Sequence, residues 1–322
     1  MSGRLNALPD MHAARAPSGR PRYAAGMRVA LCQLPVSPEP SINLERVAEA
    51  MASAAQQGAD LAVFPEATQV RFGSDLRAAA EPLDGAFCGG LAELARGAGV
   101  ALVAGVFEPA LDRDGRVYNT AVAYDGSGEL VAAYRKIHLF DSLGEHESAL
   151  VAPGSEIVVA DLAGIRTGFA TCYDLRFPEL ARALVARGAE LIVVPGAWAA
   201  GLFKEEHWVT LVRARAIENT VWVAAAGQVP DPASPPTRAP TGVGRSMLVD
   251  PMGTVRADLG LWSQVTVAEL DSALTARVRT VLPSLEHRRD DVFGPADPAR
   301  AALTMPVSGS GPATERDAAP YR

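Results

Sequence analysis

Residues 58–67 read GADLAVFPEA, and residues 188–197 read GAELIVVPGA, so two distant segments of the chain are nearly alike. Each contains a short apolar run, typical of a buried strand, and Pro65 closes the first of them. Upstream of each lies another apolar strand with a cysteine near its end, Cys32 in VALCQL and Cys172 in GFATCYD, followed by a helical pattern. Strand–helix–strand thus recurs at an offset of 130 to 140 residues.

The repeat predicts one α/β domain with two similar halves, each a sheet with helices on its outer side. Chance similarity of buried strands in a chain rich in Val and Ala is the alternative. Residues 125–128 (DGSG) and 163–164 (AG) predict hairpin turns. The other strands are expected at 28–34, 100–107, 117–124, 130–134, 157–162, 165–170, 221–226, 246–249 and 265–270, and helices over about 44–58, 90–98, 178–187 and 204–218.

Composition excludes several classes of protein. The chain has 322 residues, a net charge of −7 and 48% hydrophobic residues, with no basic block, so nucleic-acid binding is not expected. No apolar run approaches the ~18 residues that a membrane span needs. Three widely spaced cysteines exclude a disulfide framework and CxxC-type metal or redox motifs. No secretory signal is visible, and a cytoplasmic protein is expected.

The ends of the chain differ from its middle. Residues 1–26 are rich in Arg and Pro without apolar periodicity, which predicts a disordered leader; a transit peptide is the alternative. Residues 27–293 form the expected domain. Residues 294–322 are rich in Pro, Ala, Gly and Ser and predict an arm or tail.

One cysteine stands where a nucleophile is expected. Cys32 lies inside an apolar strand and Cys88 beside two glycines, so both are interpreted as packing residues. Cys172 lies between a strand and a helix that starts near Pro178. Such a turn exposes a side chain at the edge of a sheet and directs backbone N–H groups toward the atom that it attacks.

A cysteine nucleophile needs a base and a group that stabilises an oxyanion. Glu66 ends an otherwise apolar strand, where a carboxylate is costly without a partner or a function. Lys136 follows the predicted strand at 130–134, and a lysine near a thiol favours the thiolate. His207 is the alternative base.

Taken together, these motifs resemble those of the nitrilase, or carbon–nitrogen hydrolase, superfamily. The resemblance covers roughly residues 27–270 and is closest to the amidase-type branch that includes omega-amidase and deaminated-glutathione amidase. It rests on 64–67 (FPEA), 134–141 (YRKIHLFD), 171–180 (TCYDLRFPEL), 195–198 (PGAW), 207–208 (HW) and 213–219 (RARAIEN).

The resemblance implies an α-β-β-α sandwich and a catalytic triad of Glu66, Lys136 and Cys172. It also implies a second glutamate after the lysine. Glu145 and Glu147 are the candidates, and Glu147 is chosen because Ser148 and then Pro153-Gly154 follow it. The backbone N–H of Tyr173 is expected in the oxyanion site and Trp198 beside the pocket.

The function implied is hydrolysis of a small carboxamide to its acid and ammonia through a thioester, with no cofactor or metal and with a homodimer as the assembly. Nitrilase and N-carbamoyl amino acid hydrolase are the alternative activities, and a non-catalytic binding member of the fold is the alternative from another class. Arg71 is a candidate for a substrate carboxylate. Asp174 and Arg176 are expected to pair and brace the turn at Cys172.

Overall fold

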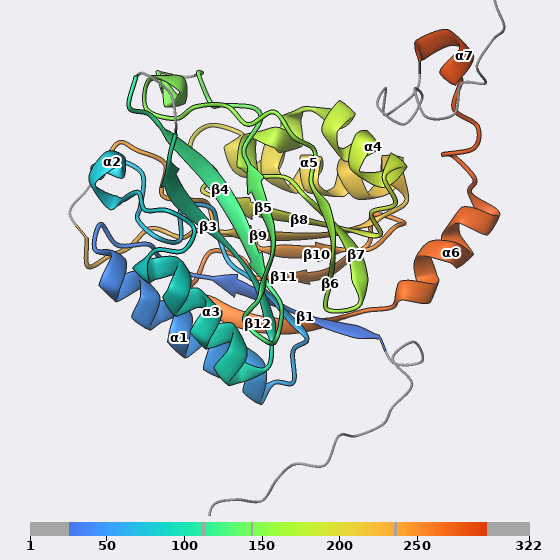
Figure 1. Ribbon diagram of the computed structural model, residues 1–322. Helices are drawn as coiled ribbons and strands as arrows, with labels where there is room; N and C mark the ends of the chain where they lie inside the picture. The colour runs from blue at the N-terminus through green and yellow to red at the C-terminus, as the bar shows by residue number, and fades with distance from the viewer. Residues whose placement is uncertain (1–25, 111–113, 143, 235–236, 295–322) are drawn as a thin grey trace, which may run out of the picture.

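The computed structural model of the chain describes residues 26–110, 114–142, 144–234 and 237–294. The expected leader and tail, apart from their residues at 26 and 294, lie outside this range. Within it, the chain forms two six-stranded sheets that face each other, with helices on the outer sides (Figure 1). The predicted α-β-β-α sandwich is therefore confirmed.

The first sheet has the order β12-β1-β2-β3-β4-β5 and the second has the order β11-β10-β9-β8-β7-β6. The strands of the first are β1 (Met27–Gln33), β2 (Leu61–Val63), β3 (Ala101–Pro109), β4 (Val117–Tyr124), β5 (Leu130–Arg135) and β12 (Gln264–Leu270). Those of the second are β6 (Val159–Leu162), β7 (Ile165–Phe169), β8 (Leu191–Gly196), β9 (Trp222–Gly227), β10 (Met247–Val249) and β11 (Val255–Asp258).

The two similar segments hold equivalent positions in the two sheets. β2 pairs in parallel with β1 and β3, and β8 pairs in parallel with β7 and β9. The carboxyl ends of neighbouring parallel strands lie at one edge of a sheet, so the residues after β2 and β8 are directed to the edges where loops gather. The two edges meet: the backbone N–H of Ala197 donates to Glu66 Oε2 at 2.8 Å.

The buried side chains of β1 belong to two separate layers of the hydrophobic core. Val29 and Leu31 of β1 face the second sheet, whereas Ala30 and Cys32 face the helices α1 (Pro40–Gln56) and α3 (Ala86–Ala98). Successive side chains of a strand point to opposite faces of its sheet. One set of side chains in β1 therefore packs against the second sheet and the other set against the helices. On the other side, α4 (Pro178–Ala186) and α5 (Lys204–Asn219) cover the second sheet.

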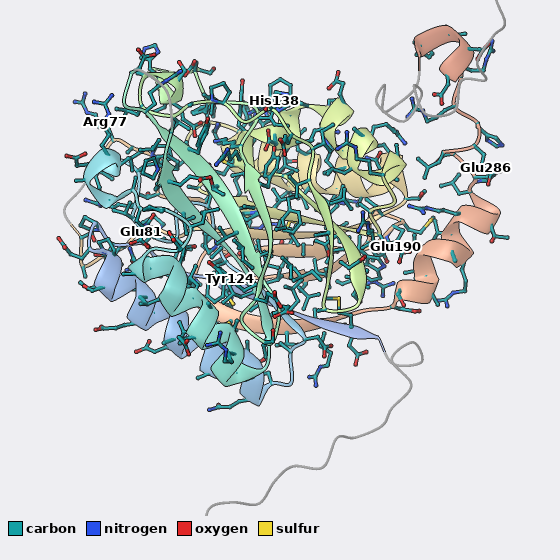
Figure 2. All side chains as sticks on the ribbon, in the orientation of Figure 1. Arg77, Glu81, Tyr124, His138, Glu190 and Glu286 are labelled. Carbon is teal, nitrogen blue, oxygen red and sulfur yellow. The ribbon has the colours of Figure 1, made fainter. Side chains whose placement is uncertain are left out.

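Cys32 and Cys88 are packing residues, as the sequence predicts. Cys88 lies on α3 and hydrogen-bonds Tyr124 at the end of β4, which Figure 2 labels. The carboxylate of Glu81 accepts the backbone N–H groups of Phe87 and Cys88 at 2.5 and 3.2 Å, and so satisfies the first turn of α3. Both cysteines are therefore held within the layer between the first sheet and its helices.

Besides two 3-10 helices, one strand and three α-helices of the described residues were not expected from the sequence: β11, α2 (Leu76–Ala79), α6 (Ser272–Val281) and α7 (Asp290–Phe293). β11 is a largely exposed edge strand, and of α6 only Thr275 and Val278 are buried. Hydrophobic periodicity predicts elements that bury one face, so it gives little signal for these. α6 and α7 extend away from the sandwich in Figure 1.

Gly105 of β3 lies directly against the backbone that carries Glu66. A Cβ atom there would come within 2.4 Å of the Ala67 nitrogen and 2.8 Å of the Glu66 Cα, and Ala67 is already held at φ +54°. We therefore expect Gly105→Ala to lower the free energy of unfolding by about 1–3 kcal/mol, the usual cost of overpacking. Urea unfolding followed by circular dichroism measures it.

Gly97 provides the matched control. It lies exposed in helix α3, and an added Cβ would meet nothing within 4 Å. Gly97→Ala should raise the free energy of unfolding by about 0.5–1 kcal/mol because alanine favours the helix. Equal stability of Gly105→Ala and the wild type would contradict the close packing at Glu66.

Candidate active site

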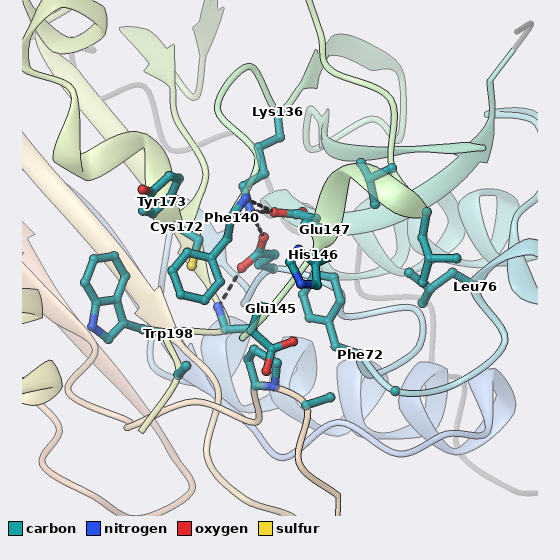
Figure 3. Close-up of a pocket in the computed structure, with 18 of the residues that line it drawn as sticks. Phe72, Leu76, Lys136, Phe140, Glu145, His146, Glu147, Cys172, Tyr173 and Trp198 are labelled. Carbon is teal, nitrogen blue, oxygen red and sulfur yellow. Dashed lines mark hydrogen bonds and ion pairs between the residues drawn. The ribbon is translucent and has the colours of Figure 1, made fainter. Parts of the chain in front are cut away.

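The three residues of the expected triad meet in one pocket, although they follow different strands. Glu66 follows β2, Lys136 follows β5 and Cys172 follows β7. All three line a cavity of about 210 Å³, which Glu147, Tyr173 and Trp198 also line (Figure 3). The structure thus brings these six residues together in one cavity. The remaining lining is largely apolar and includes Phe72, Leu76, Phe140, Leu150 and Val151.

Cys172 opens the short 3-10 helix η2 (Cys172–Arg176) at a φ of +48°. Non-glycine residues seldom adopt this left-handed conformation, and its cost is typical of functional turns. Two hydrogen bonds hold the turn: the backbone N–H of Thr171 donates to the Asp174 carboxylate, and the backbone N–H of Asp174 donates to the Thr171 carbonyl at 3.0 Å. The predicted strand-to-helix turn is therefore present, and it directs the sulfur into the pocket (Figure 3).

Asp174 fastens this turn to the segment after β5. Its carboxylate accepts the backbone N–H of Thr171 at 2.8 Å, the Tyr134 hydroxyl at 2.7 Å and the backbone N–H of His138 at 3.1 Å. His138 Nδ1 lies 2.7 Å from the same carboxylate. Asp174 thereby sets the position of Cys172 relative to the chain that carries Lys136.

The expected ion pair between Asp174 and Arg176 is wrong. All partners of Asp174 come from neighbouring N–H and O–H groups, which a buried carboxylate needs. The Arg176 guanidinium instead lies 5.0 Å from the centroid of the Trp198 ring and 3.3 Å from His207 Nδ1. His207, the alternative base, is thus exposed and directed to Arg176.

Lys136 is buried and held by two carboxylates. Its Nζ lies 2.9 Å from Glu66 Oε1 and 2.8 Å from Glu147 Oε2. Burial alone would lower the pKa of Lys136, but the charges of Glu147 and Glu66 outweigh it and raise that pKa well above its usual value. The ammonium is therefore charged at neutral pH. Of the two candidate glutamates, Glu147 makes this contact, whereas Glu145 lines the pocket beside it.

Glu66 has a partner for each carboxylate oxygen. Oε1 accepts from Lys136 and from Asn119 Nδ2 at 2.8 Å, and Oε2 accepts the backbone N–H of Ala197. Asn119 also donates to Glu147 Oε1 at 3.1 Å. Sequence reasoning missed Asn119; the available signal was an amide side chain inside the otherwise buried strand β4.

The pKa of the Cys172 thiol lies well above its usual value. Burial is the largest cause, the charge of Glu66 adds to it, and Lys136 opposes it. Lys136 thus favours the thiolate, as expected, but the other two effects exceed it. At neutral pH the sulfur keeps its proton, and Glu66 is the adjacent acceptor. Burial also raises the pKa of Cys88, to about 11.

Arg71, the sequence candidate for a substrate carboxylate, does not line the cavity; the next residues, Phe72 and Gly73, do. Within the described part of the chain, no group of three or more His, Cys, Asp or Glu side chains is arranged to hold a metal ion. None of the helices that the structure describes is long and apolar enough to cross a membrane.

An α-β-β-α sandwich with a glutamate, a lysine and a cysteine in one buried pocket defines the nitrilase-type class of proteins. The chain belongs to the carbon-nitrogen hydrolase family, whose model matches residues 28–280.

Named relatives agree with this family. A hydrolase of Mycobacterium tuberculosis is 43% identical over 275 residues, which are 83% of this chain and 97% of that protein. The deaminated glutathione amidase of Escherichia coli is 36% identical over 267 residues, 82% and 97% of the two chains. An amidase from Nesterenkonia superposes with a TM-score of 0.70 at 31% identity, over 87% and 98% of the chains. That structure is a glutamate-to-glutamine variant with an acetamide group joined to its active-site cysteine.

The thiol pKa gives a prediction for Glu66→Gln. The substitution removes the negative charge that raises the pKa of Cys172, so the thiolate forms at lower pH. At pH 8, Cys172 should react several-fold faster with a small neutral reagent such as methyl methanethiosulfonate, because a larger fraction of the sulfur is thiolate. Mass spectrometry of the Cys172 peptide between pH 7 and pH 10 measures the rates.

In the wild type, the reaction should accelerate as the pH rises, because burial and the charge of Glu66 raise the pKa of the Cys172 thiol. Glu145→Gln is the control: Glu145 also lines the pocket but makes no contact with Lys136 among the described residues. A slower reaction in Glu66→Gln than in the wild type would contradict this electrostatic account of the thiol.

Proposed function

We propose that this protein is an amidase that converts a small carboxamide to its acid and ammonia through a thioester on Cys172. The observation that carries the proposal is the buried contact of 2.9 Å between Glu66 and Lys136 in the pocket that Cys172 enters. It supplies a base beside a protonated thiol and a fixed cation beside the site of attack. The names of the Escherichia coli and Nesterenkonia relatives support amide chemistry.

In the first half-reaction, Cys172 Sγ bonds to the amide carbonyl carbon while Glu66 takes the thiol proton. The carbonyl oxygen becomes an oxyanion. Lys136 has three N–H donors, which contact Glu66 Oε1 and both oxygens of Glu147. In the proposed step, the donor to Glu147 Oε1 turns to the substrate oxygen, while Glu147 Oε2 keeps the ammonium in place. The backbone N–H of Tyr173, one residue after the nucleophile, is the second donor. Each donor of this kind typically contributes about 10²–10³ in rate.

The intermediate then collapses. The C–N bond breaks as Glu66 returns the proton to the leaving nitrogen, and ammonia departs from the thioester. Glu66 next takes a proton from water, whose oxygen attacks the thioester carbon. The C–S bond breaks, the acid leaves, and the proton on Glu66 restores the Cys172 thiol. One carboxylate thus serves in turn as base and acid.

Glu147 acts through Lys136 and not on the substrate. Its carboxylate accepts from Lys136 Nζ and from the backbone N–H of Phe140 at 2.7 Å, so it is fixed at both ends. This arrangement orients the ammonium and offsets the cost of its burial. Glu66 is then able to exchange its proton while Lys136 stays charged.

The expected homodimer stays a prediction. α6 and α7 extend from the sandwich and expose Val281 and Phe293, which are 78% and 84% accessible. Analytical ultracentrifugation measures the assembly.

Replacing the nucleophile tests the proposed reaction. Cys172→Ala should lower ammonia release by at least about 10³-fold, as expected when a covalent nucleophile is lost. The substrate panel is a set of small amides, the matching nitriles and N-carbamoyl amino acids, with ammonia and carbon dioxide measured. Cys88→Ala is the control: it removes another buried thiol, one outside the pocket, and should retain turnover. Normal turnover by a folded Cys172→Ala protein would overturn the mechanism.

A comparison of Glu147 with Glu145 gives a separate test of the proposed site. Glu147→Gln removes a charge that raises the pKa of Lys136 and weakens its positioning, so kcat should fall by about 10²-fold, as when one oxyanion donor is lost. Glu145→Gln should change kcat by less than about threefold. Steady-state kinetics on the best amide separates the two, and equal losses would contradict the choice of Glu147.

A further inference from the structure

Gln228 follows β9 and is buried where the edges of the two sheets meet. It is 1% exposed and does not line the cavity. Its side-chain Nε2 donates to the backbone carbonyl of Glu66 at 2.6 Å. This hydrogen bond joins the end of a strand of the second sheet to the residue that carries the proposed base in the first. The proposed reaction assigns no step to Gln228.

The backbone of Gln228 holds a second group that contacts Glu66. Its N–H donates to the Gly196 carbonyl at 2.9 Å, which continues the pairing of β8 and β9 by one residue. The Gly196 carbonyl and the Ala197 N–H belong to one planar peptide group, so fixing one fixes the direction of the other. That Ala197 N–H is the donor to Glu66 Oε2 at 2.8 Å.

These contacts close a ring that begins and ends at Glu66. It runs from the Glu66 carbonyl through the side chain and backbone of Gln228 to the peptide group between Gly196 and Ala197, and it returns to Glu66 Oε2. All four residues are buried, so each bond is made away from solvent. The backbone and the carboxylate of Glu66 are therefore both tied to one residue of the opposite sheet.

The segment at 242–244 supports Gln228 from behind. The Gln228 carbonyl accepts the backbone N–H of Gly244 at 2.8 Å. A Cβ atom at Gly242 would come within 2.0 Å of the same carbonyl oxygen, so this backbone packs directly against Gln228. The side chain of Gln228 thus reaches Glu66 from a fixed position.

Proton transfer depends on the distance that this ring sets. Burial and the charge of Glu66 raise the pKa of the Cys172 thiol, and a hydrogen bond from the Ala197 N–H lowers it. The peptide group that Gln228 holds therefore contacts both the nucleophile and its base. A displacement of about 1 Å in such an arrangement is costly, even when its cause lies outside the reacting groups.

We infer that Gln228 is a positioning residue for the proton transfer between Cys172 and Glu66. It fixes the base through the Glu66 backbone and through the Ala197 N–H, and it does not touch the substrate. This inference rests on the proposed amidase reaction, and it adds a residue outside the pocket that sets the rate of that reaction.

Steady-state kinetics of Gln228→Met tests the inference. Methionine has nearly the length of glutamine but no N–H donor, so only the bond to the Glu66 carbonyl is lost. We expect kcat on the best amide to fall by about 10–100-fold because the base is displaced. KM should change by less than about threefold, because Gln228 does not line the cavity.

Gln33→Met is the matched control. Gln33 is as deeply buried, and its side chain also crosses between the sheets: it donates to the carbonyls of Gly260 and Trp262 and accepts the backbone N–H of Ser246. It has no contact with Glu66 among the described residues. Gln33→Met should lose stability, as Gln228→Met does, but keep kcat within about threefold of the wild type.

The reactivity of Cys172 gives a second measurement, which needs no turnover. Glu66→Gln is expected to speed the reaction of Cys172 with methyl methanethiosulfonate, because it removes a charge held beside the sulfur. In the Gln228→Met background this gain should shrink, because the charge is no longer held there. In the Gln33→Met background it should stay whole. If the wild type hydrolyses no amide but the gain shrinks in this way, the proposed function fails and the positioning of Glu66 by Gln228 stands.

Three results would overturn the inference. One is an unchanged kcat in Gln228→Met. Another is an equal loss of kcat in Gln228→Met and Gln33→Met, which would make Gln228 a structural residue only. The third is the same gain from Glu66→Gln in both backgrounds. Gln228→Asn keeps an amide that is one methylene too short, and it serves for the same comparisons if Gln228→Met does not fold. Thermal unfolding establishes that each variant is folded in the assay.

Discussion

The buried ammonium of Lys136 is the constraint on which the rest of the site depends. A charge with 2% exposure is tolerated only beside opposite charges with good hydrogen-bond geometry. Two carboxylates meet this requirement from separate parts of the chain: Glu66 follows β2, and Glu147 opens the 3-10 helix η1 (Glu147–Ala149). Asn119 donates to both and holds them at the spacing that one ammonium bridges. Fold and electrostatics are therefore satisfied by the same contacts.

The two sheets contribute different halves of this arrangement. The first sheet supplies Glu66 and Lys136, and the second supplies Cys172 and the Ala197 N–H that fixes Glu66. Asp174 crosses the same boundary in the other direction, from the turn at Cys172 to Tyr134. A shift of one sheet against the other would break hydrogen bonds to buried carboxylates, which is costly. The packing between the sheets thus sets the distance between base and nucleophile.

The parts of this structure that could be predicted from the sequence are those with a local signal. The repeated segments identified β2 and β8, and the motif around Cys172 identified a strand-to-helix turn whose φ is +48°. Asn119 and Lys204 gave only a weak signal, because an amide in a strand and a lysine at a helix start become informative only when distant residues surround them. The predicted pair of Asp174 and Arg176 failed for the same reason. Opposite charges two residues apart suggested an ion pair, but long-range donors satisfied the carboxylate.

The pocket contains two lysine ammonium groups, and their positive charges are balanced in different ways. Around Lys136, one ammonium faces two carboxylates, so the reacting centre carries its own counter-charges. Around Lys204, one ammonium faces two aromatic rings and lies near a guanidinium. A site that must transfer protons benefits from a fixed, closed set of charges, because no reorganisation is then required during the reaction. The two lysines of this cavity therefore differ in how their burial is compensated: carboxylates surround Lys136, whereas Lys204 lies against the faces of Trp198 and Phe140.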